Sequence, residues 1–224
     1  KFGEVTVGAG LNVAYNKNKI ESMPGKGYVG TGYNQRNATG QEFNSYYVYK
    51  ADGFFQSDAE AEEYMNKYWP ADGSKGACPF SGGKFKAGDL KYADLNGDGS
   101  IDDFDKGAIG KPNLPTTTLG WSFGGYWKGF SFNVLFQGSF DYSFAINGTG
   151  IESFKSQFQP IHTGRWTLDR YKNGEEITFP RLTTNPSTIN SASTYMSDFW
   201  LINAWYIRLK TIDLGYQLPK TVLP

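Results

Sequence analysis

The sequence predicts an all-β protein, and more narrowly the antiparallel strands of a large transmembrane β-barrel with long extracellular loops. Aromatic residues make up 17% of the 224 residues and there are 28 glycines, a mixture that suits pleated strands and tight turns. Several segments alternate apolar and polar residues well beyond the usual strand length of about 5–6 residues. The connections between these segments are either very short or very long, as in outer-membrane barrels.

Alternation places four strands along the chain, near residues 3–16, 118–128, 130–142 and 204–218. In the two middle strands one face is aromatic and aliphatic, and the other is small or polar. The apolar set is Trp121, Phe123, Trp127, Phe132, Val134 and Phe136, and the polar set is Ser122, Gly124, Asn133 and Gln137. Because side chains in a strand point alternately to opposite faces, we expect the first set to face lipid and the second the barrel interior.

Two local features refine the strand prediction. Only Lys128 and Gly129 separate the middle strands, which predicts a tight hairpin. In the last strand the apolar positions shift from odd to even numbers near Lys210 and Thr211, which predicts a β-bulge.

The long connections, near residues 17–117 and 143–203, are predicted to be extracellular excursions, since periplasmic turns are short. Ser57 and Glu60 form a capping box before a helical pattern that Pro70 ends, so one short helix is expected there. The β-rich stretch Tyr46–Tyr49 is interpreted as part of a local hairpin.

Composition excludes several classes of protein. Lys plus Arg and Asp plus Glu are both 22, so the net charge is zero and the basic surplus of a nucleic-acid binder is missing. No apolar run is long enough for a transmembrane helix, and the mean hydropathy is −0.50. A single cysteine, Cys78, allows no internal disulfide. The only histidine, His162, is expected at the surface, and no pattern predicts an enzyme.

Residues 94–105 match a calcium-binding loop in spacing and residue type. Gly99 occupies the sixth position, where the loop turns sharply. The expected ligands are Asp94, Asn96, Asp98, Ser100 through its carbonyl, Asp102 and Asp105. The flanking residues do not read as helices, so a solitary structural Ca²⁺ loop is expected rather than a paired EF-hand. The alternative is an acidic, solvated turn without metal.

Ordered motifs along nearly the whole chain resemble the SusC/RagA family of TonB-dependent outer-membrane transporters. They include residues 49–57, 88–103, 109–113, 126–130, 136–138, 165–167, 180–182, 197–201, 206–210 and 214–219. The resemblance departs mainly in residues 60–86 and 152–164. It implies a late segment of a barrel of about 22 strands, with the N-terminal plug domain absent from residues 1–224.

The resemblance also implies partners and a location. Such proteins import glycans or peptides across the bacterial outer membrane in Bacteroidetes, working with a SusD-like lipoprotein and, through an N-terminal part, with TonB. The competing interpretation is a soluble calcium-stabilised glycan-binding or dockerin-like module. The two differ in whether the aromatic faces of the long strands are exposed to lipid or packed in one closed core.

Overall fold

The computed structural model describes residues 4–218 apart from 26, 33, 81–83, 149, 153, 156 and 185–188. Gly3, the first residue of one predicted strand, and Pro219, the last residue of the motif 214–219, therefore lie outside the described residues. The chain forms two compact units. Unit 1 comprises residues 1–19, 111–143 and 203–224, and unit 2 comprises residues 20–110 and 144–202.

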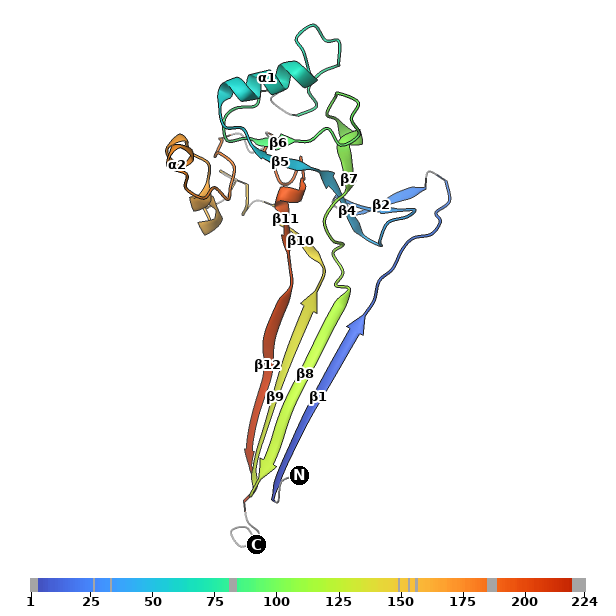
Figure 1. Ribbon diagram of the computed structural model, residues 1–224, viewed down its shortest axis with the longest axis vertical. Helices are drawn as coiled ribbons and strands as arrows, with labels where there is room; N and C mark the ends of the chain where they lie inside the picture. Colours follow the sequence, from blue (N-terminus) through green and yellow to red (C-terminus); the bar gives the residue numbers. More distant parts are fainter. Residues whose placement is uncertain are drawn as a thin grey trace. The chain divides into compact units, whose positions relative to one another are not determined.

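Unit 1 is an antiparallel sheet of four strands in the order β1-β8-β9-β12, lying side by side in Figure 1. Their bounds are Val5–Tyr15 (β1), Thr117–Trp127 (β8), Phe130–Phe140 (β9) and Tyr206–Tyr216 (β12). Each strand has 11 residues, and a tilted strand needs about 9–11 to cross a bilayer. The sheet is open, with β1 and β12 at its edges.

The predicted hairpin joins β8 to β9. Lys128 and Gly129 have φ angles of 46° and 89°, the left-handed values that a two-residue turn matching the strand twist requires. The carbonyl of Gly129 accepts a hydrogen bond from the amide of Gln217 at 2.7 Å, which ties the turn to the end of β12.

The predicted bulge is also present. The pairing of β12 with β9 shifts between Leu209 and Thr211. Leu209 lies opposite Phe136, and Ile212 lies opposite Val134. Since directly paired residues share a face, the extra residue Lys210 keeps the apolar side chains before and after it on the same face.

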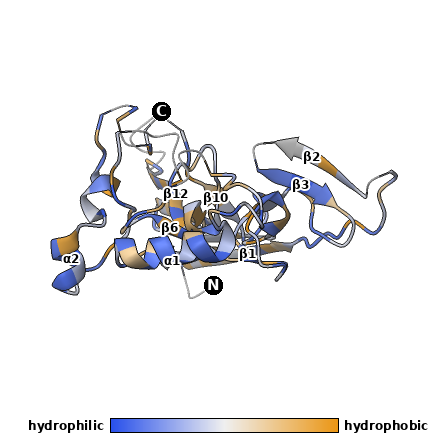
Figure 2. Cartoon of the chain, turned by 90° about the horizontal axis from the view of Figure 1, so that it is seen from above, coloured by the Kyte–Doolittle hydropathy of each residue, from blue (hydrophilic) through white to orange (hydrophobic). Residues whose placement is uncertain are grey.

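Unit 2 contains shorter strands, some paired with their neighbours in sequence and others with distant segments. One sheet has the order β2-β3-β4-β7 and another pairs β5 with β6. Their bounds are Tyr28–Gly32 (β2), Gln35–Ala38 (β3), Ser45–Tyr49 (β4), Ala51–Phe54 (β5), Leu90–Tyr92 (β6) and Lys106–Ala108 (β7). β2 and β3 form a hairpin, visible in Figure 2. A further pair joins β10 (Ser143–Ala145) to β11 (Leu201–Asn203).

The stretch Tyr46–Tyr49 is part of a local hairpin, as predicted, because β4 pairs antiparallel with the preceding strand β3. It also has a partner that was not predicted, since its other edge pairs with β7, which lies far along the chain. The stretch is central in its sheet, and Val48 and Tyr49 are fully or almost fully buried. A run that is apolar on both faces is typical of a strand buried on both sides, and alternation alone does not identify its partners.

Helix α1 (Asp58–Tyr68) begins as predicted, and its visible turns are largely hydrophilic in Figure 2. Ser57 Oγ accepts the amide of Glu60 at 3.1 Å, and the Glu60 carboxylate accepts the amide of Gln56 at 2.7 Å. A second helix, α2 (Leu168–Lys172), was not predicted; its five residues give too short a periodic pattern to detect. Among the described residues, no helix is long and apolar enough to cross a membrane.

The core of unit 2 is mainly aromatic. Phe80 stacks on Tyr92 with centroids 4.8 Å apart, and Trp69 stacks on Phe85 at 5.9 Å. Phe179 and Trp200 meet edge to face at 5.4 Å. This packing fixes the loops that carry the acidic residues described below.

Candidate functional site

The first candidate site is the sheet of unit 1, whose two faces differ sharply in chemistry. Direct pairing places Trp121 opposite Phe136 and Phe123 opposite Val134, so these side chains share one face, as predicted. The rings of Trp121 and Phe136 stack with centroids 5.3 Å apart. Large side chains of this face remain exposed within the chain: Val7, Leu11, Val13, Trp121, Phe123, Trp127, Phe130, Ile207, Leu209, Ile212, Leu214 and Tyr216. An apolar face of this extent needs lipid or a partner to cover it.

The opposite face of the same sheet carries the polar residues. Ser122 and Gly124 pair with Leu135 and Asn133, which places them together on this second face. Side chains on this polar face form hydrogen bonds between β9 and β12. Arg208 Nη2 donates to Gln137 Oε1 at 3.0 Å, and Asn133 Nδ2 donates to Asp213 Oδ2 at 3.4 Å. The face also has a shallow, glycine-rich depression lined by Thr6, Gly8, Ala9, Gly10, Ser122, Gly124, Gly125, Tyr126 and Asn133.

The second candidate site is the acidic loop 94–105 of unit 2. Asp94 accepts the amides of Gly97 and Gly99 at 2.7 and 2.9 Å, and Asp98 accepts the amide of Ser100 at 2.8 Å. Asn96 Oδ1 accepts the amide of Asp98 at 2.9 Å. The loop therefore folds around its own amides, with Gly97 and Gly99 in the left-handed region.

The end of the loop is anchored in the core. Asp105 is fully buried, and its two oxygens accept the amides of Leu95 at 2.8 Å and Asp102 at 2.8 Å. Asp102 caps the short 3₁₀ turn at Asp103–Asp105 by accepting the amide of Phe104 at 2.7 Å. Ile101 is also fully buried.

The donor set of the loop is made entirely of oxygens, the ligand type that Ca²⁺ prefers. Across the part of the chain that the structure describes, however, no three or more His, Cys, Asp or Glu side chains are gathered so that they could hold a metal ion. Lys75 Nζ also donates to the carbonyl of Gly99 at 3.0 Å, bringing a positive charge to the loop. The six expected ligands thus fit calcium by chemistry, and calcium binding stays a prediction.

Sequence reasoning missed two buried carboxylates in unit 2. Asp89 is 1% exposed. Its carboxylate accepts a hydrogen bond from Asn190 Nδ2 at 2.6 Å and forms an ion pair with Arg181, whose Nε lies 2.6 Å away. Glu152 Oε1 accepts Ser191 Oγ at 2.5 Å and the amide of Ser193 at 3.0 Å, while Oε2 pairs with Lys155. Most of these partners are distant in sequence, so no local pattern indicated either cluster.

The surface position expected for His162 is wrong. The residue is 3% exposed and packs edge to face against Phe179 at 4.8 Å. Its Nδ1 accepts the amide of Gln159 at 2.8 Å, and its Nε2 lies 2.8 Å from the carbonyl of Ile151. Both ring nitrogens are occupied, so the residue has a structural role.

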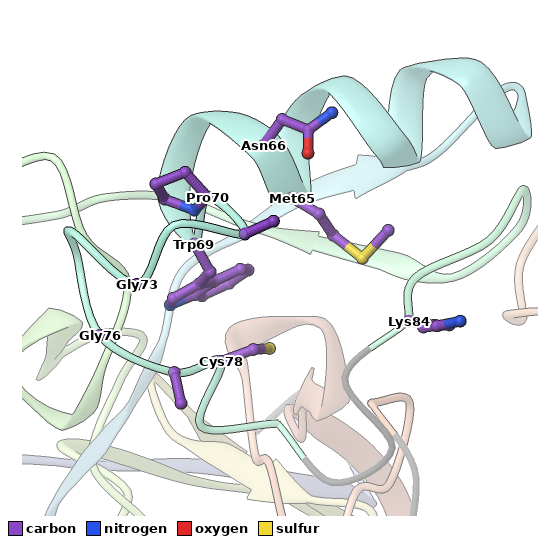
Figure 3. Close-up of a pocket in the computed structure, with 10 residues that line it drawn as sticks. Met65, Asn66, Trp69, Pro70, Gly73, Gly76, Cys78 and Lys84 are labelled. Atoms are coloured by element: carbon purple, nitrogen blue, oxygen red, sulfur yellow. The ribbon is translucent and has the colours of Figure 1, made fainter.

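Cys78 lies at the rim of an open pocket of about 560 Å³ beneath the end of α1. The pocket is lined by Met65, Asn66, Trp69, Pro70, Ala71, Gly73, Gly76, Ala77, Cys78 and Lys84. In Figure 3 the indole of Trp69 extends from the helix end toward the segment that carries Cys78. Burial raises the pKa of the Cys78 thiol, which lowers its reactivity.

Comparison with known proteins bears on the two-faced sheet. A TonB-dependent receptor, P3, from Formosa agariphila is 25% identical over an alignment of 234 positions, which covers 98% of this chain. The RagAB peptide transporter has the same fold over the whole chain, with a TM-score of 0.66 at 18% identity. The RagAB importer in its "open-open" state gives a TM-score of 0.65. No family model matches the sequence.

The resemblance to the SusC/RagA family is confirmed. The chain spans about a fifth of the length of these relatives, 20% of the receptor and 21% of the RagAB chain. The predicted location in the bacterial outer membrane is confirmed by the same similarities.

Proposed function

We propose that this chain forms part of the wall and loops of a TonB-dependent outer-membrane importer. The observation that carries the proposal is the division of the unit 1 sheet into an exposed apolar face and a polar face, in a chain similar to such proteins over its full length. A soluble module would bury the apolar face in a closed core, and here Leu214 is 82% exposed. In the proposed barrel the apolar face meets lipid and the polar face lines the interior.

The proposal extends to substrate and partners. The importer takes up glycans or peptides and works with a SusD-like lipoprotein, and TonB acts through parts outside this chain. One relative is named as a peptide transporter, which favours peptides as the first class to test. A deletion strain should lose growth on a peptide mixture or on an oligosaccharide mixture, and growth unchanged on both would contradict import of these classes.

Neighbouring positions of β12 test which face meets lipid. With Cys78 replaced by Ser, Leu214→Cys should react with a lipid-soluble maleimide and resist a membrane-impermeant one in outer-membrane vesicles. Asp213→Cys, on the opposite face, should show the reverse preference. Reversed labelling would mean that the lumen and lipid faces have been exchanged, which a one-residue register slip produces.

We also propose that loop 94–105 binds a structural Ca²⁺ ion. Asp94, Asn96, Asp98, Ser100, Asp102 and Asp105 supply oxygens at the required spacing, and a cation offsets the repulsion between their carboxylates. Binding stabilises the folded protein by about 2.7 kcal/mol when free calcium is a hundredfold above the dissociation constant.

Calorimetric titration with calcium tests this site in the intact protein. Asp98→Ala should weaken binding, whereas Asp72→Ala should not, because Asp72 lies outside loop 94–105 and accepts the amide of Ser74 at 2.9 Å. Absence of heat and of any shift in melting temperature at millimolar calcium would overturn the proposal.

A further inference from the structure

Arg36, in the middle of β3, holds its guanidinium group between two tyrosine rings. The Cζ atom lies 3.5 Å from the ring centroid of Tyr28 and 4.0 Å from that of Tyr47. Both distances are well inside the range of about 6 Å over which a cation is attracted to an aromatic face. The two faces of the planar group are therefore covered, and only its edge is left for hydrogen bonding.

Strand register explains how the sequence builds this arrangement. Arg36 lies opposite Gly30 on β2 and opposite Ser45 on β4. Tyr28 and Tyr47 are each two positions from those partners, which places them on the same face of the sheet as diagonal neighbours of Arg36. Gly30 leaves room beside the arginine, and the two rings approach it from the two flanking strands.

The guanidinium group has no acceptor among the described residues. Its Nε is buried and has no hydrogen-bond partner, although Arg36 as a whole is only half-buried. By contrast, Arg181 pairs with Asp89 and Arg170 donates to the carbonyl of Glu176 at 3.3 Å. Because Nε is buried, the donors left for a ligand are those of the two terminal Nη groups.

We propose that Arg36 is a recognition site for a carboxylate group, presented by the β2-β3-β4 sheet. A guanidinium edge offers two parallel N–H donors that match the two oxygens of a carboxylate in one plane. The rings of Tyr28 and Tyr47 fix the orientation of that plane and lower the entropy lost on binding. They also restrict approach to the plane of the guanidinium, which suits a planar carboxylate better than a tetrahedral phosphate. This site is independent of the proposed import function.

Titration of the intact protein in detergent with a tetraglutamate peptide tests the site. Arg36→Gln should weaken binding by about tenfold or more, the loss expected for one charge-assisted contact. Arg36→Lys keeps the positive charge but loses the two parallel N–H donors of the guanidinium, so it should also weaken binding. This second variant keeps the test valid if the glutamine variant does not fold. Arg170→Gln is the matched control and should leave the affinity unchanged.

Further titrations distinguish specific recognition of a carboxylate from non-specific attraction to any negative charge. Tetraglutamine, which lacks carboxylates, and inorganic phosphate should both bind more weakly than tetraglutamate. Tyr28→Phe should preserve the affinity for tetraglutamate, and Tyr28→Leu should reduce it. Four results would each overturn the assignment. The first two are no binding of tetraglutamate at millimolar concentration and equal binding of tetraglutamine. The other two are tighter binding of phosphate and an affinity of the Arg36→Gln variant within twofold of that of the wild type.

Discussion

Asp89 and Glu152 are both buried, yet the fold shifts their pKa values in opposite directions. Burial raises the pKa of Asp89, and its contacts with Arg181 and Asn190 offset that effect only in part. Burial also acts to raise the pKa of Glu152, but hydrogen bonds from Lys155, Ser191 and Ser193 outweigh it, so the net pKa is lowered. Asp89 receives at least as many donors as Glu152, including the amide of Lys86 at 2.8 Å, so the opposite direction of its pKa reflects a greater loss of water.

Glu152 therefore contributes stability that depends on pH. Its folded pKa lies below the unfolded value of about 4.3, so the contribution is present above that value and is lost as pH falls through the folded pKa. Glu152→Gln should lower the melting temperature near neutral pH and make it less sensitive to acid between about pH 5 and 3. Thermal melts across that range check this, with Glu62→Gln, at an exposed position of α1, as the control. An unchanged acid slope in the Glu152 variant would contradict the assignment.

At the scale of the element, the two-residue turn between β8 and β9 limits which residues can replace Gly129. Its φ is +89°, and an added Cβ would lie 2.9 Å from the carbonyl oxygen of Gln217. Gly129→Ala should destabilise the hairpin by at least about 1–2 kcal/mol, the cost of a left-handed conformation for a residue with a Cβ.

The measurement is the melting temperature of the intact protein in detergent. Gly8→Ala is the matched control, because Gly8 lies in β1 of the same sheet and an added Cβ meets nothing within 4 Å. Equal melting temperatures for the two variants would show that the turn conformation does not limit stability.

The bulge at Lys210 acts on a whole strand. Without it, Ile212, Leu214 and Tyr216 would fall on the face of Arg208, and Asp213 would join the apolar face. The apolar residues of β12 have odd numbers before the bulge and even numbers after it. The one inserted residue therefore places both sets on the same face. It also explains why the strand keeps a single lipid-type face over its 11 residues.

At the scale of the whole molecule, the sheet of unit 1 has open edges at β1 and β12 and an exposed apolar face. Both features promote association of chains in water. The isolated 224-residue chain should therefore form aggregates or non-native oligomers in detergent-free buffer. Analytical ultracentrifugation checks this, and a monodisperse monomer that melts cooperatively would contradict the barrel-wall interpretation.

The sequence by itself determined the elements whose rules are local. A period of two places the four long strands and separates Trp121 from Ser122, because a strand alternates its side chains whatever it pairs with. The Lys128-Gly129 turn, the bulge near Lys210 and the Ser57 cap also depend only on residues close in sequence. The spacing of loop 94–105 is local too, although spacing alone does not decide whether metal binds.

Only the tertiary structure decided which distant segments meet. β4 pairs with β7, Asp89 contacts Arg181 92 residues away, and His162 is buried against Phe179. The Arg36 site likewise requires Tyr28 and Tyr47 from two flanking strands in a particular register. Such contacts arise because burying aromatic surface favours whichever segments fit together, and that fit depends on shape and register rather than on any pattern within one segment.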